Sequence, residues 1–278
     1  MNSSEWSLLF FTLIGQFSAG VTLSLFLFSL LHHSSDHVKP LLGLRYGLIT
    51  ASLSIITALV ISFLHLSAPF SSVYALSNLR NSWLSREIFM VSAYAAVIIF
   101  VTLYEWKSSR KVYLTSLLLL SAIAGLSMVY SMGRLYMIET VPVWNTPKTL
   151  LVFYGTTFLL GFSFVLVILL NQMSEKMIKP FVFIILLMLV IKSVCFFMDW
   201  KTENTDPMIF TQQHLPKIWK ILWWSWIPGF FILTGIRFKK NLRMKNQQYF
   251  YTIAFIFFVI AEFAARVIFY ASYFRIGV

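Results

Sequence analysis

The chain has 278 residues, of which 59% are hydrophobic and only 12% are charged. Soluble globular chains carry about 25% charged residues, so this composition excludes an ordinary soluble domain and indicates an integral membrane protein. The formal net charge of +12 would suggest a nucleic-acid partner in a soluble chain. In a membrane protein, however, basic residues first report which side of the bilayer each connector faces.

Eight apolar segments follow one another along the chain, and a helix needs about 20 apolar residues to cross a bilayer. The segments cover residues 7–31, 46–66, 87–104, 112–133, 149–170, 180–198, 218–236 and 249–270. The connectors are short and polar and carry the Gly, Pro, Asn or charged residues that mark helix ends. The sequence therefore predicts an all-α integral membrane protein, a bundle of eight transmembrane helices in a single transmembrane domain over residues 1–278. No basic stretch precedes the first segment, so we expect that helix to stay attached rather than to act as a signal peptide.

Lys and Arg are unevenly divided between the two sets of alternate connectors. The connectors after the first, third, fifth and seventh segments hold 12 of them, and the opposite side holds 8. The positive-inside rule assigns the richer side to the cytoplasm, which predicts that both termini lie outside. Topology and contact with lipid headgroups account for the positive charge, so no nucleic-acid partner is expected.

Few ionisable residues lie at membrane depth, where they are costly and often functional. Glu87 opens the third segment, Lys192 lies in the sixth, and Glu262 and Arg266 lie in the eighth. Glu262 and Arg266 are four residues apart and share one helix face, which predicts a structural ion pair that fixes helix packing. Lys192 is expected to extend toward the outer end of its helix or to meet Asp199.

His65 is the one histidine placed at the outer end of a predicted membrane helix. Membrane haem b usually needs two imidazoles from facing helices at one level, and no convincing pair is present. The single cysteine, Cys195, excludes an internal disulfide and a four-cysteine iron–sulfur site. We therefore expect no haem, no iron–sulfur cluster and no metal in this chain. A boundary residue at the membrane surface is the alternative interpretation of His65.

The connector that follows His65 is long and ends at Glu87. Pro69 breaks the helix, and Arg86 is among the residues that bring hydrogen-bonding groups back to the membrane surface. Oxidation of a quinol releases two protons, so its site needs a proton acceptor with a pKa near neutral, for which histidine is the default side chain. A carboxylate such as Glu87 would orient the imidazole or carry the proton away. The ring and isoprenoid tail would need an apolar, aromatic-lined groove that opens to lipid.

Four sequence blocks at consistent separations span nearly the whole chain. They are EWSLLFFTLIGQFSAG, which contains Gln16; the stretch from His65 through LSREI; RLYMIETVPVWNTP, which contains Arg134 and Tyr136; and AEFAARVIFY, which contains Glu262 and Arg266. Together these blocks resemble the membrane-anchor subunit of the bacterial anaerobic dimethyl sulfoxide reductase family. In that family the anchor is the third subunit, beside an iron–sulfur electron-transfer subunit and a molybdenum catalytic subunit.

The resemblance implies an eight-helix subunit of the bacterial inner membrane that oxidises menaquinol and contains no redox centre of its own. Electrons would pass to the iron–sulfur subunit and on to the molybdenum subunit. His65 and Glu87 are carried over as the catalytic residues of the quinol site, with Gln16, Arg134 and Tyr136 as further quinol-binding candidates. The resemblance does not extend to the terminal electron acceptor, which belongs to the catalytic subunit.

Two other functions are weighed against this one. The alternative is a small-solute or proton transporter, and a purely structural tether is the third. Transporters often contain inverted repeats and helices unwound at mid-membrane, whereas Pro228 and Gly229 form the one mid-helix interruption and predict a kink. The chain departs from the family pattern at Lys192, Glu203 and Asp206, which have no clear counterpart there.

Overall fold

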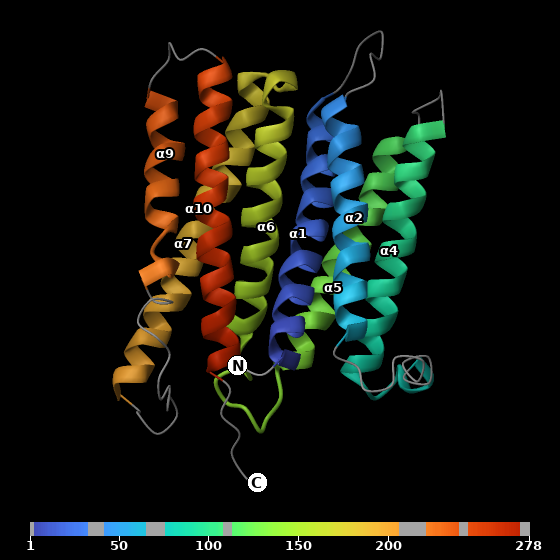
Figure 1. Cartoon of the computed structure of the whole chain (residues 1–278), viewed down its shortest axis with the longest axis vertical. Coiled ribbons are helices and arrows are strands. Elements are labelled where there is room, and N and C mark those ends of the chain that lie inside the picture. The colour runs from blue at the N-terminus through green and yellow to red at the C-terminus, as the bar shows by residue number, and fades with distance from the viewer. Residues whose placement is uncertain are drawn as a thin grey trace.

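The computed structural model describes residues 3–32, 42–64, 76–107, 113–205, 221–238 and 244–272, and in these ranges all regular structure is helical. Seven helices are long and apolar enough to cross a membrane, and they stand side by side in one bundle (Figure 1). They are α1 (Ser3–Leu31), α2 (Leu42–Leu64), α4 (Trp83–Lys107), α5 (Leu114–Tyr136), α6 (Pro147–Leu169), α7 (Glu175–Thr205) and α10 (Met244–Ala271). A shorter apolar helix, α9 (Trp226–Phe238), lies beside α10. The predicted all-α membrane class is thus confirmed, with seven of the described helices long enough to span.

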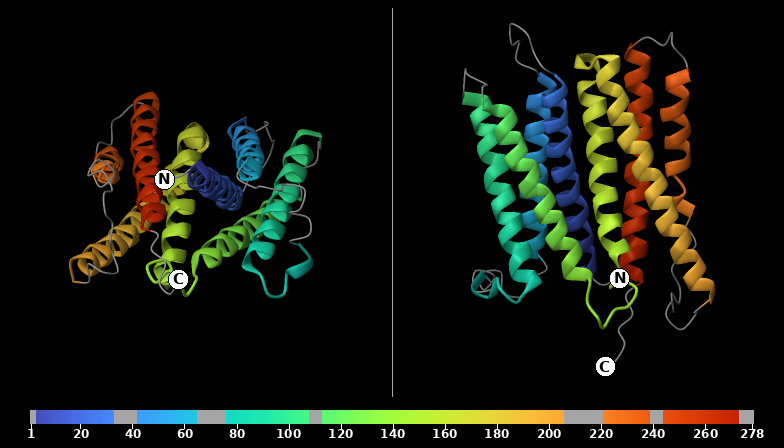
Figure 2. Two further views of the ribbon diagram at one scale, coloured as in Figure 1. Left: turned by 60° about the horizontal axis from the view of Figure 1, so that its bottom comes forward. Right: turned by 180° about the vertical axis from the view of Figure 1, so that it is seen from behind.

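Helices α1 and α6 form the centre of the bundle. In their most apolar stretches 72% and 61% of the residues are buried, against 33–44% in the other long helices. Helix α1 contacts α2 and α5 on one side and α6 and α10 on the other, while α6 also contacts α7. Figure 2 shows α2, α4 and α5 on one flank of this centre and α7, α9 and α10 on the other.

Two glycines allow α1 and α6 to touch along their backbones. A methyl group on Gly20 would overlap the carbonyl group of Thr157, and one on Gly161 would overlap the backbone of Gly20. Lipid tails are as apolar as helix surfaces, so helices in a membrane associate through packing, which small residues at the crossing permit. The central contact of the bundle therefore depends on the absence of side chains at these two positions.

Two predicted helix boundaries are wrong. Helix α7 begins at Glu175 rather than at Pro180, and the backbone N–H of Met177 bonds the carbonyl of Ser174 at 2.9 Å to close its first turn. The predicted kink at Pro228 is instead the first turn of α9, which starts at Trp226 after a turn at Trp224. Proline fits there because the first N–H groups of a helix have no intrahelical partner.

The ends of the described helices define two ends of the bundle. Helix α1 begins and α10 ends at the same end, which we call the terminal end, and α4 and α6 also begin there (Figure 1). The Tyr270 hydroxyl reaches the Leu8 carbonyl at 3.3 Å across this end. At the opposite end, Asn171 donates to Gln248 at 3.4 Å, which places the end of α6 beside the beginning of α10.

Candidate functional site

Glu87 is buried on α4, with 6% of the residue exposed. It lies in the second turn of the helix, close to the terminal end, where α5 and α10 also end. The predicted contact between Glu87 and His65 stays a prediction, because His65 lies outside the described residues. The structure therefore shows the environment of one half of the expected quinol site.

Tyr136 and Tyr270 join the ends of α5 and α10 through their hydroxyl groups, which are 2.6 Å apart. The Tyr270 hydroxyl also lies 3.3 Å from Thr12 Oγ1 on α1. Trp144, in the connector before α6, packs edge-on against Tyr136 and donates from its indole nitrogen to the Phe269 carbonyl at 3.0 Å. Tyr136 is thus part of a buried hydrogen-bonded cluster at the terminal end.

One turn further into the bundle, Arg266 of α10 binds Gln16 of α1. Nη2 of Arg266 donates to Oε1 of Gln16 at 2.5 Å, and the guanidinium lies 4.1 Å from the centre of the Phe153 ring. Both polar side chains are buried. Nη1 of Arg266 and Nε2 of Gln16 have no hydrogen-bond partner in the described part of the chain. Gln16 therefore accepts a hydrogen bond from a buried arginine.

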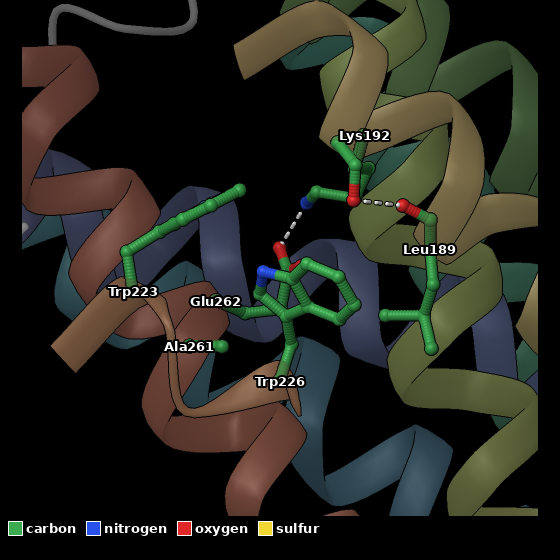
Figure 3. A pocket seen from close by; sticks show the side chains of 7 residues that line it. Leu189, Lys192, Trp223, Trp226, Ala261 and Glu262 are labelled. Atoms are coloured by element: carbon green, nitrogen blue, oxygen red, sulfur yellow. Dashed lines mark hydrogen bonds and ion pairs between the residues drawn. The ribbon is translucent and has the colours of Figure 1, made fainter. Parts of the chain in front are cut away.

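The prediction that Glu262 forms an ion pair with Arg266 is wrong. Glu262 forms a buried ion pair with Lys192 of α7, drawn as a dashed line in Figure 3. Thr156 of α6 donates to Glu262 Oε2 at 2.6 Å and receives a hydrogen bond from Lys192 Nζ at 3.0 Å. The expectation that Lys192 extends toward the end of its helix is wrong as well, because its ammonium group faces α10. Three helices therefore converge on one carboxylate.

A groove of about 420 Å³ lies between α4 and α5 and reaches α6. Met90, Ile123 and Leu126 line its apolar part. Its polar groups are the hydroxyls of Ser127, Ser131, Tyr130 and Tyr154 and the guanidinium of Arg86. Ile123 and Tyr130 are 54% and 43% exposed, so the groove opens on the outer surface of the bundle.

Trp83 lies at the rim of the groove between two arginines. The guanidinium carbon of Arg86 is 4.3 Å and that of Arg134 is 5.0 Å from its ring centre, which is within the range of cation–π attraction. Arg86 also donates to the carbonyls of Leu79 at 2.9 Å and Arg80 at 2.5 Å. Two guanidinium groups therefore border the groove. Both contact the indole ring of Trp83, and that of Arg86 is also bonded to backbone carbonyls.

The structure describes four of the five predicted site residues, because His65 lies outside the described ranges. Gln16 and Tyr136 belong to the buried polar network, Glu87 is buried on α4, and Arg134 borders the groove. Sequence reasoning missed the groove and the pairing of Lys192, since neither follows from spacing along the chain. The available signal for the buried network was the spacing of Glu262, Arg266 and Tyr270, which recur every four residues along α10.

Among the described residues, no three or more His, Cys, Asp or Glu side chains gather in a way that could hold a metal ion. Cys195 is a buried cysteine on α7. The expected lack of haem and of iron–sulfur clusters stays a prediction.

These features define a multi-pass helical membrane protein with a buried polar network and a surface groove that has apolar and polar lining residues. The family model described as "DMSO reductase anchor subunit (DmsC)" matches residues 1–272, and the chain belongs to this family. It is also similar to the C subunit of the anaerobic dimethyl sulfoxide reductase of Haemophilus influenzae. The two are 25% identical over 278 residues, which cover 98% of this chain and 96% of the relative. The resemblance expected from the four sequence blocks is confirmed.

Replacing Glu262 by Gln should lower the amount of assembled protein in the membrane. The change leaves Lys192 buried without its counter-charge, and breaking a buried ion pair costs about 3–5 kcal/mol. The double variant Lys192→Met, Glu262→Gln removes both charges and should recover much of the lost abundance, as measured by immunoblotting of membranes. Glu105→Gln is the control, because its partner Arg45 is 34% exposed and solvent screens that pair. A double variant no more abundant than Glu262→Gln alone would contradict this account of the pair.

Proposed function

We propose that this chain is the membrane anchor and menaquinol-oxidising subunit of a dimethyl sulfoxide reductase-type respiratory complex in the bacterial inner membrane. It passes electrons from menaquinol to an iron–sulfur subunit, which passes them on to a molybdenum catalytic subunit. The observation that carries the proposal is the groove beside Trp83 and Arg86, on the same helix as Glu87, in a chain of the DMSO reductase anchor family.

The groove has the size and chemistry that a quinol needs. Ligand pockets typically enclose about 300–1,000 Å³ and combine apolar walls with a few polar groups, and this groove of 420 Å³ has both. The hydroxyls of Ser127, Ser131 and Tyr130 are available to bond the oxygens of a quinol ring. The open side, at Ile123, lets an isoprenoid tail run out between lipid chains.

Glu87 and His65 carry out the proton chemistry in this proposal. His65 accepts a proton from a quinol hydroxyl, and Glu87 orients the imidazole or relays the proton. Arg134 contacts Trp83 at the edge of the space for the quinol ring. Gln16 and Tyr136 support the site from the buried network. The chain needs no metal for this step, because the electrons leave directly for the iron–sulfur subunit.

We further propose eight membrane crossings in one transmembrane domain. Helix α7 leads away from the opposite end after Glu175, yet α10 starts at that end beside Asn171. The chain between α7 and α10 must therefore return along the bundle, and α9 lies on this path (Figure 2). The connectors richer in Lys and Arg are those of the opposite end, so the terminal end faces the periplasm. The iron–sulfur subunit then docks on that face, within a short distance of the groove.

His65→Ala should leave the complex membrane-bound and able to reduce its acceptor with an artificial dye, but should abolish most menaquinol-driven turnover. Dyes deliver electrons to the soluble subunits, whereas the quinol loses its proton acceptor. Loss of a general base typically slows a reaction about 100- to 10,000-fold. Glu87→Gln should give a milder defect. Menaquinol oxidation near the wild-type rate in His65→Ala would refute the assignment and leave His65 a boundary residue.

Ser127→Trp should block the groove without disturbing the bundle. An indole at this position projects into the space that we assign to the quinol ring, so KM for a menaquinol analogue should rise while dye-driven turnover is unchanged. Leu120→Trp is the matched control, since Leu120 lies on the same helix, is 52% exposed and does not line the groove. Equal quinol kinetics in the two variants would place the quinol elsewhere.

A reporter that is active only in the periplasm should give signal when fused after Val278. A fusion in the segment between α9 and α10 should give none, because this segment belongs to the set with 12 basic residues against 8. The reverse pattern of signals would overturn the orientation.

A further inference from the structure

Arg86 is the charged side chain that lines the groove between α4 and α5 in the described part of the chain. The other lining residues are apolar, aromatic or hydroxyl-bearing, and no carboxylate is among them. Arg86 forms no ion pair with a described residue, although Glu87 follows it in the sequence. A guanidinium does not lose its proton in proteins, so the groove holds a positive charge without a counter-charge. A cleft lined by one sign of charge attracts ligands of the opposite sign.

Two backbone carbonyls hold this guanidinium in place. Nε of Arg86 donates to the Leu79 carbonyl at 2.9 Å, and Nη2 donates to the Arg80 carbonyl at 2.5 Å. The guanidinium carbon also lies over the Trp83 ring, 4.3 Å from its centre. Because these contacts exist before any ligand enters the groove, binding costs little further ordering of the side chain.

Arg86 keeps hydrogen-bond donors for a ligand after these contacts. A guanidinium has N–H groups at Nε, Nη1 and Nη2, with two hydrogens on each of the last two nitrogens. The bonds to the backbone leave both hydrogens of Nη1 and one of Nη2 without a partner in the described part of the chain. These donors carry positive charge, and hydrogen bonds from a charged donor to an anion are roughly twice as strong as neutral ones.

The hydroxyl groups of the groove are weaker donors than Arg86. Ser131 Oγ donates to the Met128 carbonyl at 2.7 Å, and the Tyr154 hydroxyl donates to the Leu126 carbonyl at 3.0 Å. A hydroxyl has a single hydrogen, so these two groups accept a bond from a ligand rather than donate one. The remaining hydroxyls of the groove are uncharged. Arg86 is therefore the lining residue best suited to bind a negatively charged oxygen.

The charged end of the groove lies at the terminal end of the bundle. Helix α4 begins there, with Trp83 and Arg86 in its first turn, and α5 ends there (Figure 1). Ile123, in the apolar part of the groove, lies deeper, because α5 rises about 20 Å from Ile123 to its last residue, Tyr136. An amphipathic ring in this groove therefore has an oxygen near Arg86 and its apolar tail toward Ile123.

We propose that Arg86 is a catalytic residue of quinol oxidation, which binds the quinolate anion formed when the quinol gives up its first proton. This proposal rests on the proposed oxidation of menaquinol in the groove. Arg86 is the residue between Ser85 and Glu87 in the block LSREI, so the sequence places it directly beside the carboxylate expected to take part in the proton chemistry.

The step balances in atoms and electrons. One O–H bond of the quinol breaks, its proton goes to His65, and the electron pair of the bond stays on the oxygen beside Arg86. The two electrons that oxidise the ring then leave for the iron–sulfur subunit, and the second O–H bond releases its proton. One quinol thus gives one neutral quinone, two protons and two electrons. Arg86 itself neither gains nor loses a proton.

The charge of Arg86 favours the middle of the reaction over its beginning and its end. Quinol and quinone are both uncharged, whereas the quinolate between them carries a negative charge. An interaction that is stronger for the charged species than for the bound substrate accelerates the reaction. The neutral quinone loses this interaction, so the same guanidinium does not retain the product.

The test compares two naphthoquinones that differ in charge. 2-Hydroxy-1,4-naphthoquinone is an anion at neutral pH and carries its charge on oxygen, as a quinolate does, whereas its methyl ether is neutral. Their dissociation constants are measured by isothermal titration calorimetry with the whole complex in nanodiscs of zwitterionic phosphatidylcholine. Wild type should bind the anion at least about tenfold more tightly than the ether. Arg86→Gln should bind the two alike, and Arg86→Lys, which keeps the charge, should retain part of the preference.

The kinetics of the same variants provide a second readout. In Arg86→Gln, kcat for a soluble menaquinol analogue should fall about 100-fold, as when one donor to a developing oxyanion is removed. KM should change little, because the bound quinol is uncharged. A rise in KM with an unchanged kcat would mean that Arg86 binds quinol and quinolate equally, and would contradict the proposed role.

Arg80→Gln is the matched control. It removes the same charge from the same connector, but Arg80 is exposed and does not line the groove, so the preference for the anion should remain. Equal weakening of both ligands in Arg86→Gln would show that Arg86 only holds the connector, and would overturn the proposal, as would an unchanged preference in this variant or no preference in wild type. Failure of wild type to oxidise the analogue at all would instead refute the proposed function on which this inference depends.

Discussion

The close approach of α1 and α6 at Gly20 and Gly161 determines where the polar side chains of this bundle meet. Helices in lipid gain little from hiding apolar surface from one another, so contact geometry and hydrogen bonds decide their arrangement. Gln16 lies one turn before Gly20, and Thr156 lies just over one turn before Gly161. Because the two backbones touch, both polar side chains are held at the centre, where Thr156 meets Lys192 and Glu262 and Gln16 meets Arg266.

Most side chains in the interior of the bundle are apolar, and a small set of fully buried charged side chains lies among them. The charges are tolerated because hydrogen-bonding side chains from different helices surround them, as Thr156 and Gln16 do. Those same bonds hold four helices in register around Glu262 and Arg266. The surface groove at Trp83, by contrast, is built from one helix pair and from arginines that reach outward. The groove and the buried network are therefore built from different sets of side chains.

The length and spacing of apolar runs predicted eight membrane helices, and the seven long helices among the described residues follow that pattern, because burial of backbone in lipid permits little else. Boundaries were less predictable, since Pro180 is tolerated inside α7 beyond its first turn. The ion pair was predicted from neighbours four residues apart on one helix, but Glu262 has its partner on α7, and a single sequence does not tell which helices adjoin. The groove at Ser127 could not be predicted either. Its walls come from different helices, and only tertiary packing determines which sides of these helices face each other.

The shortness of α9 has a consequence for the surrounding lipid. Its 13 residues rise about 20 Å, less than the roughly 30 Å of a bilayer core. A short crossing is accommodated by local thinning of the bilayer and by flanking residues that reach the interface. Trp223 and Trp226 at its start lie beside the buried Lys192–Glu262 pair, so this end of α9 lies inside the bundle. With α9 as the proposed eighth crossing, the membrane beside it is expected to be thinner than beside α2, and this flank of the protein is expected to favour lipids with shorter acyl chains.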